Sequence, residues 1–285
     1  MKWEVNDTDY KTVRDFIRYS IGLSRNTLRS VKFNGGELKV NGKRVDVRHP
    51  LKNGDRVEIT FPTETRGPLL FPEGGELDIV YEDDFLLVVN KPAGIATIPS
   101  PIHKSGTIAN RLIYYYDKIG LSSTIHIVTR LDRDTSGLML VAKYAFFHGL
   151  LHNSEIDRGY KALVNGELPQ EEGVIDAPIG RKSDSIIERE VSDEGKKAIT
   201  HFKRRHQTND YTWVDLKLDT GRTHQIRVHL AHIGYPLIGD DLYGGDCQLL
   251  KRHALHCDYL RFFHPITKEY VQLKSQIPDD LAPFQ

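Results

Sequence analysis

The chain has 285 residues, enough for about two domains of roughly 150 residues and for a substantial buried core. Its composition, 39% hydrophobic and 27% charged, is that of a globular protein and excludes a disordered, collagen-like or coiled-coil chain. Two cysteines, Cys247 and Cys257, are too few for a disulfide framework. Because no signal peptide and no apolar run long enough to span a bilayer are found, we expect a cytoplasmic protein without a membrane segment.

Charge is distributed unevenly along the chain, although 39 basic and 39 acidic residues cancel overall. Residues 1–66 hold 14 Lys and Arg against 9 Asp and Glu, a net charge of +5, which leaves the remainder at −5. The excess is concentrated in residues 11–56, where 12 basic residues stand against 4 acidic ones. A basic module joined to a mildly acidic body is typical of an appendage that binds a polyanion.

The basic segment predicts a small module of helices and strands. Two short amphipathic helices and then two strands are expected over residues 13–17, 24–31, 37–43 and 57–60. The Ser24 hydroxyl is placed to cap the second helix, and Asn41-Gly42 tolerates the positive φ of a tight hairpin. One helical face would carry the cations Arg18, Arg25, Arg29 and Lys32. Three prolines and three glycines within residues 62–75 then predict a domain boundary.

The remaining 210 or so residues predict an α+β domain. Strand patterns occur at residues 77–90, around an Asp83-Asp84 turn, and at 138–142, 160–164, 212–218 and 270–273. Helical patterns occur at residues 108–116, 145–153 and 224–232. Because strands dominate and the helices interleave irregularly, we expect a mixed, mostly antiparallel sheet.

The densest charge beside an apolar strand lies in residues 129–134 (TRLDRD), ahead of the apolar sequence LMLVA. A nearby arginine stabilises an ionised carboxylate, so Arg130 and Arg133 favour an anionic Asp132. A positioned, anionic aspartate is suited to act as a nucleophile or a general base. The alternative is a charged turn capped by Thr135 and Ser136, without chemistry.

A second polar segment, residues 221–230 (GRTHQIRVHL), begins at a glycine turn. We expect Thr223 to cap a helix that runs to His232. Helical spacing places His224 and Arg227 on the same face. An arginine on a core-facing surface needs a carboxylate partner, which makes Arg227 a candidate for a buried ion pair.

Signatures of metal and cofactor binding are missing from the sequence. Eight of the thirteen histidines lie between His201 and His264, yet no HExxH and no Cys-x-x-Cys accompanies them. The zinc deaminase signature is also absent. We therefore expect no metal site. Because no Walker A, no GxGxxG after a strand and no GxSxG sequence is present, nucleotide hydrolysis, dinucleotide binding and the common esterase chemistry lose their usual sequence support.

Five segments in a fixed order resemble the pseudouridine synthases of the large-subunit ribosomal RNA type. They are NKPAG, RLDRDTSGLMLVAK, RGYKALVNG, GRTHQIRVHLAHIGYPLIGD and HALHCDYLRFFHP, from about Leu77 to Phe263. The earlier order of two helices, VNGKRV and NGDRVEI is similar to the alpha-L RNA-binding domain of ribosomal protein S-four. The resemblance implies an RNA-binding domain at 1–66, a linker at 67–75 and a pseudouridine synthase domain at 76–285.

The resemblance also implies roles for four residues. Asp132 would be catalytic and Arg227 would pair with its carboxylate. Tyr160, in the segment RGYK, would stack on the target base, and Arg130 would fill the space that the flipped base leaves. In one departure, Thr129 stands where the family usually has a histidine before R-L-D.

The implied reaction is the isomerisation of uridine to pseudouridine in structured RNA, without a cofactor, by a monomer. Ribosomal RNA is the expected substrate, and transfer RNA remains open. So does the choice between attack of the aspartate on the sugar and assistance to proton removal. The alternatives are a nucleosidase or glycosidase, which also uses paired carboxylates, and a noncatalytic RNA-binding or ribosome-assembly factor.

Overall fold

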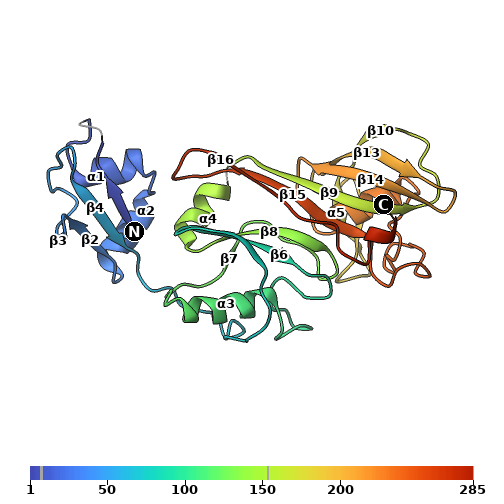
Figure 1. The fold of residues 1–285 in the computed structure, drawn as a ribbon, viewed down its shortest axis with the longest axis horizontal. Helices are drawn as coiled ribbons and strands as arrows, with labels where there is room; N and C mark the ends of the chain where they lie inside the picture. The colour runs from blue at the N-terminus through green and yellow to red at the C-terminus, as the bar shows by residue number, and fades with distance from the viewer. Residues whose placement is uncertain (7–8, 153, 285) are drawn as a thin grey trace.

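The computed structural model describes residues 1–6, 9–152 and 154–284, which form two domains joined by an ordered connection (Figure 1). The small N-terminal domain has a four-stranded antiparallel sheet in the order β1 (Lys2–Glu4), β4 (Arg56–Thr60), β2 (Glu37–Val40) and β3 (Lys43–Arg44). Its helical segments are α1 (Val13–Asp15), the π-helical η1 (Phe16–Ser20) and α2 (Arg25–Phe33).

Local sequence signals in the small domain are confirmed. The Ser24 hydroxyl accepts the N–H of Thr27 at 3.0 Å and caps α2, because the first helical amides have no intrahelical partner. Asn41 and Gly42 have φ of 51° and 78°, the backbone that a two-residue hairpin turn between β2 and β3 requires. The predicted first helix is present as one α-turn followed by a π-turn.

The large domain is built on one mixed sheet, and the predicted α+β class is confirmed. Eight strands are hydrogen bonded in the order β10 (Glu172–Asp176), β13 (Ile199–Gln207), β14 (Tyr211–Leu218), β9 (Ile156–Asn165), β15 (Leu255–Phe263), β8 (Ser136–Ala142), β6 (Leu86–Lys91) and β5 (Ile79–Glu82). Two more strands join at the side, β16 (Tyr270–Lys274) on β15 and β7 (His126–Ile127) on β8. Within the described chain, only β8 and β15 pair in parallel, so the sheet is mostly antiparallel as expected.

Helices α3 (Ile108–Lys118), α4 (Ala145–His152) and α5 (Gln225–His232) flank this sheet (Figure 1). A short hairpin of β11 (Ile179–Arg181) with β12 (Arg189–Val191) and the 3-10 turn η2 (Ala282–Phe284) complete the domain. The three predicted helices are confirmed. Position 153, the expected end of the second one, lies outside the described residues.

The parallel junction of β8 and β15 is tight because a glycine stands there. Gly137 has φ of 113°, which L side chains rarely adopt, and an added Cβ would overlap the backbone of Cys257. All seven residues of β8 are buried. This close approach brings the loop before β8 alongside β9, which is the next strand beyond β15.

The connection between the domains packs on the large domain. The Phe61 ring stacks on Phe146 of α4, with ring centroids 5.9 Å apart. The Glu64 carboxylate accepts the N–H of Ala145 at the start of α4 and the hydroxyl of Ser123. His126 of β7 also contacts this carboxylate. Residues that follow the small domain are therefore anchored to the large one by both apolar and polar contacts.

Candidate active site

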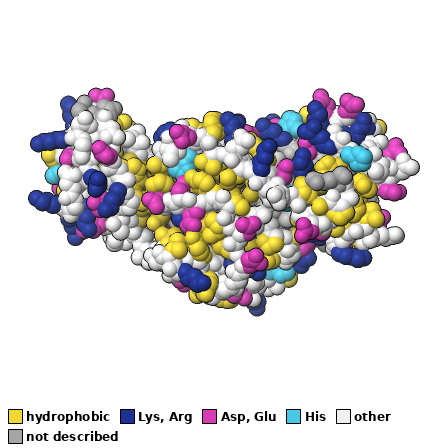
Figure 2. Space-filling view, in the orientation of Figure 1, with side chains coloured by type: hydrophobic (Ala, Val, Ile, Leu, Met, Phe, Trp, Pro, Cys, Tyr) yellow, Lys and Arg dark blue, Asp and Glu magenta, His cyan; other side chains and the backbone are white. Residues whose placement is uncertain are grey.

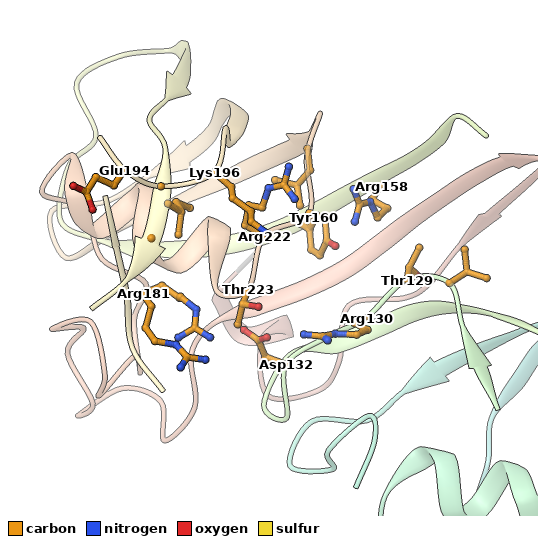
Figure 3. A pocket seen from close by; sticks show the side chains of 17 residues that line it. Thr129, Arg130, Asp132, Arg158, Tyr160, Arg181, Glu194, Lys196, Arg222 and Thr223 are labelled. Carbon is orange, nitrogen blue, oxygen red and sulfur yellow. The ribbon is translucent and has the colours of Figure 1, made fainter. Parts of the chain in front are cut away.

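Asp132 lines a cavity of about 720 Å³ between the loop before β8, the β11–β12 hairpin and the turn before α5 (Figure 3). Its charged lining is dominated by cations, and it comprises Arg130, Arg158, Arg181, Arg189, Lys196 and Arg222 against Asp132 and Glu194. The cavity is therefore strongly positive although residues 67–285 carry a net charge of −5. A low-dielectric cleft lined by one sign of charge concentrates ligands of the opposite sign, such as phosphates.

The backbone around Asp132 is held by side-chain donors on both sides of the residue, of which Thr97 and Lys91 are buried. The carbonyl groups of Leu131, Arg133 and Asp134 accept hydrogen bonds from Thr97 Oγ1 at 2.6 Å, Lys91 Nζ at 2.8 Å and Arg252 Nη1 at 3.1 Å. Lys91 is 1% exposed and also donates to two carbonyl groups of its own turn. These bonds fix the loop without using the carboxylate of Asp132 itself.

Arg227 of α5 contacts two carboxylates, and the stronger partner is not the predicted one. Its Nε and Nη2 donate to the two oxygens of Asp240, each at 2.7 Å, and the Asp240 side chain is fully buried. Its Nη1 lies 3.6 Å from Asp132 Oδ2. Burial alone would lower the pKa of Arg227, but the hydrogen bonds and charge of Asp240, with Asp132, raise it above the usual value. A permanently charged arginine thus stands beside Asp132.

Tyr160 and Arg130 lie on the same cavity as Asp132 (Figure 3). Tyr160 of β9 is 5% exposed, and burial raises the pKa of its hydroxyl well above the usual value. It also lines a small adjoining cavity of about 50 Å³ together with Asp132 and Arg227. Arg130 is exposed, and its guanidinium makes no ion pair or hydrogen bond to any other described residue. The four predicted site residues therefore meet at one place.

Comparisons with known proteins identify this arrangement. A sequence profile described as RNA pseudouridylate synthase matches residues 85–232, which include all four predicted site residues. The chain belongs to the RNA pseudouridine synthase family. These enzymes isomerise uridine to pseudouridine in RNA, so the chain is an intramolecular isomerase that acts on RNA.

Similarity to individual synthases extends over nearly the whole chain. The "Uncharacterized RNA pseudouridine synthase YjbO" of Bacillus subtilis (strain 168) is 47% identical over 275 residues, 95% of this chain and 97% of the relative. The "Ribosomal large subunit pseudouridine synthase D" of Pseudomonas aeruginosa is 38% identical, covering 86% and 82%. The solved structure of "Human RNA Pseudouridylate Synthase Domain Containing 1" has a TM-score of 0.56 and 27% identity, covering 74% and 88%. The large-subunit ribosomal RNA type of synthase, predicted from the motifs, is confirmed.

Two local features distinguish the loops before β8 and α5. The hydroxyl of Thr129, the residue that replaces the usual histidine, accepts the N–H of Leu140 at 2.9 Å and ties the loop to β8. The expected cap of α5 by Thr223 is wrong, because His224 occupies the N-cap position with φ of 57°. With His224 as the N-cap, α5 begins at Gln225, one residue later than it would with Thr223 as the cap.

Four of the eight histidines between His201 and His264 are buried in the fold, namely His229, His253, His256 and His264. His253 and His256 are buried and hydrogen bond to the hydroxyls of Thr135 and Ser136, at 2.8 and 2.9 Å. Burial lowers the pKa of His256 to about 4. Within residues 1–6, 9–152 and 154–284, no group of three or more His, Cys, Asp or Glu side chains could hold a metal ion. None of the helices described there is long and apolar enough to cross a membrane.

Three residues near the carboxylate were missed in the sequence. Asp240 and Tyr243 lie in the loop after α5, and nothing in their local pattern distinguishes them from turn residues. The sequence pattern predicts His224 on the same helical face as Arg227 but indicates no function for it, whereas the structure places its Nε2 3.9 Å from Asp132 Oδ2. The sequence predicts that a buried Arg227 needs a carboxylate partner, but it does not show that this partner is Asp240, 13 residues later.

Proposed function

We propose that the enzyme modifies uridines of ribosomal RNA and that Asp132 is its catalytic carboxylate. The observation that carries the proposal is the position of Asp132 in a cationic cavity, 3.6 Å from the Arg227 guanidinium. In the reaction, the bond between ribose C1′ and uracil N1 breaks, and a bond between C1′ and C5 forms. C5 loses one proton and N1 gains one, so the balance requires no oxidant and no cofactor.

Asp132 serves this reaction either by attack at C1′ or by removal of a neighbouring ribose proton. Both routes need an ionised carboxylate, which Arg227 stabilises electrostatically. Both also need water to be kept away from the activated sugar. The burial of Arg227, Asp240 and Tyr160 around the carboxylate supports such an enclosed position.

Access to the sugar requires the target uridine to leave its stack, which costs a few kcal/mol. Tyr160 provides an aromatic surface at the cavity on which a base can stack, and such stacking contributes about 1–3 kcal/mol. Arg130 is exposed at the rim and has no partner among the described residues, so its guanidinium is available to fill the position of the displaced base. These two contacts would together offset the flipping cost.

The small domain would supply additional affinity for RNA. Lys and Arg side chains gather on its outer edge in Figure 2. On α2, the cations Arg25, Arg29 and Lys32 are exposed and make no ion pair within the part of the chain described. Two of the most exposed large apolar side chains lie in this domain, Tyr19 at 73% and Phe33 at 69%. Cations beside exposed rings suit a strand of RNA, whose phosphates and bases take both kinds of contact.

The ribosomal target follows from relatives that carry the name ribosomal large subunit pseudouridine synthase. The test is to map pseudouridines in total RNA from three strains: one that lacks the gene, and two in which the deletion is complemented by the wild-type gene or by the Asp132→Asn variant. We expect ribosomal RNA sites to disappear, to return with wild type and not with Asp132→Asn, checked for deamidation. Sites restored by Asp132→Asn would refute the catalytic role, and lost sites confined to transfer RNA would refute the target. A ribosome-assembly defect without any lost site would favour the noncatalytic alternative.

The role of the small domain can be tested with a matched pair of aromatic positions. Tyr19→Ala and Phe33→Ala should each weaken binding to deproteinised ribosomal RNA by about 1–3 kcal/mol, with little effect on kcat. Tyr114 of α3 is the control, because it is exposed and has Lys118 over its ring at 4.5 Å, as Phe33 has Lys32 at 4.8 Å. Equal effects at all three positions would show that the small domain has no special contact with RNA.

A further inference from the structure

His224 connects the Asp132 carboxylate to a tyrosine outside the predicted site. Its side chain is 11% exposed, and its Nε2 lies 3.9 Å from Asp132 Oδ2, the oxygen that Arg227 also approaches. Its Nδ1 lies 2.8 Å from the hydroxyl oxygen of Tyr243. The imidazole thus stands directly between the carboxylate and the tyrosine.

The hydrogen bonds of Tyr243 decide which nitrogen of His224 carries the proton. The backbone N–H of Arg189 can only donate, so the Tyr243 oxygen accepts this bond at 3.0 Å. The hydroxyl proton then goes to His224 Nδ1, its other hydrogen-bond partner in the described chain. Burial raises the pKa of Tyr243 and lowers the pKa of His224, so the tyrosine keeps its proton and the imidazole is neutral. The neutral ring therefore carries its own proton on Nε2, facing Asp132.

The tyrosine is itself held in place by the ion pair that supports the site. Arg227 lies over the Tyr243 ring, 5.0 Å from its centroid. The Tyr243 backbone N–H donates to Asp240 Oδ1 at 3.3 Å. Because one pair of buried charges orients both Asp132 and Tyr243, a change in either residue of the pair would also disturb His224.

The backbone does not explain why a histidine is needed at position 224. Its φ of 57° is left-handed, which glycine and asparagine adopt at least as readily, and its side chain makes no cap hydrogen bond to α5. A residue kept in such a conformation beside a reacting group is a candidate for function. Only an imidazole ring offers two nitrogens for these contacts, Nδ1 toward Tyr243 and Nε2 toward Asp132.

We propose that His224 is a positioning residue, whose Nε2–H donates to Asp132 Oδ2 when RNA is bound. With Arg227 it fixes one oxygen of the carboxylate, and it leaves Oδ1, which makes no hydrogen bond to the described residues, for the reaction. The separation of 3.9 Å is longer than a hydrogen bond, but such contacts commonly shorten when a substrate binds. The inference rests on the proposed catalytic role of Asp132.

The test compares variants of the full chain in steady-state pseudouridine formation on deproteinised ribosomal RNA from cells that lack the gene. His224→Asn keeps a group that can reach Tyr243 and suits the backbone, but it does not reach Asp132. We expect kcat to fall about 10- to 100-fold, with KM for RNA within about twofold and Tm unchanged or higher. His224→Gln places an amide N–H near the carboxylate, so its kcat should be at least about threefold higher than that of His224→Asn. The exposed His232 on the same helix is the control, and His232→Asn should leave kcat unchanged.

A double-mutant cycle tests the connection to the tyrosine. Tyr243→Phe keeps the ring under Arg227, loses the hydroxyl, and should lower kcat about 3- to 10-fold. Combined with His224→Asn it should have no further effect, because the tyrosine acts through the imidazole. Independent, multiplicative effects would overturn the inference, as would a His224→Asn enzyme within twofold of wild type while Asp132→Asn is inactive. An active Asp132→Asn enzyme would instead refute the proposed function itself.

Discussion

Replacing Arg227 by methionine should damage stability and catalysis through two different carboxylates. The stability cost arises at Asp240, which is fully buried and would lose two charge-assisted hydrogen bonds of 2.7 Å. An unpaired buried charge costs about 3–5 kcal/mol, and at about 2–4 °C per kcal/mol this lowers Tm by roughly 6–20 °C. Asp132 is 27% exposed and contributes little to that cost. Its loss of the adjacent positive charge should instead lower kcat by about 10²–10³-fold.

The double variant Arg227→Met/Asp240→Leu separates the two effects. Replacement of a buried ion pair by apolar residues of similar volume is often neutral, so most of the lost stability should return. Activity should not return, because Asp132 still lacks its cation. Urea unfolding and single-turnover kinetics on the same protein samples measure the two outcomes. The reasoning would be refuted if the double variant were no more stable than Arg227→Met, or if it regained wild-type turnover.

Two further predictions concern the charged groups Lys91 and Asp83, whose pKa values the fold shifts. Lys91→Met removes three hydrogen bonds to backbone carbonyls and should cost about 3 kcal/mol or more in urea unfolding. Burial also lowers the pKa of Lys91 from 10.5 to about 7, so between these pH values the unfolded chain binds more protons than the folded one. The free energy of unfolding should therefore increase from pH 7 to pH 10.5 in the wild type, and this increase should be smaller in Lys91→Met. Burial opposes ionisation of Asp83, but hydrogen bonds from His264, Tyr81 and two backbone amides lower its pKa from 3.8 to about 2. The stability that ionised Asp83 provides should therefore be lost as pH falls from about 4 to 2, and Asp83→Asn, which lacks it throughout, should show a shallower acid transition in denaturant melts.

Much of the fold could be predicted because its strands and helices carry strong local patterns. Strands such as β8 are continuous apolar runs, and α2 begins at a side chain that satisfies its first amides. Asp132 and Tyr160 could be located because each lies in a distinctive sequence segment, Asp132 shortly before strand β8 and Tyr160 within strand β9. The pairing of β8 with β15, which brings them together, leaves only a glycine as a local trace.

The rest of the site depends on contacts between distant segments. The positive cavity gathers cations from the β11–β12 hairpin, residue 196 and the turn before α5, while the net charge of the large domain points the other way. Asp240 reads as part of a turn, and only the position of α5 over that turn makes it the partner of Arg227. The left-handed backbone of His224 likewise depends on how the chain enters α5. The preference of threonine for N-cap positions, which predicts a cap at Thr223, does not indicate this conformation.

The anchored connection has a consequence for the shape of the RNA that the enzyme can use. Because Phe61 and Glu64 attach the chain to α4 and β7, we expect the rotation of the small domain with respect to the cavity to be limited. An RNA that contacts both the small domain and the cavity would then have to present its target uridine and the segment bound by the small domain at a fixed separation. A flexible tether would accept many spacings and discriminate little, whereas a stiff one converts distance along a folded RNA into selectivity.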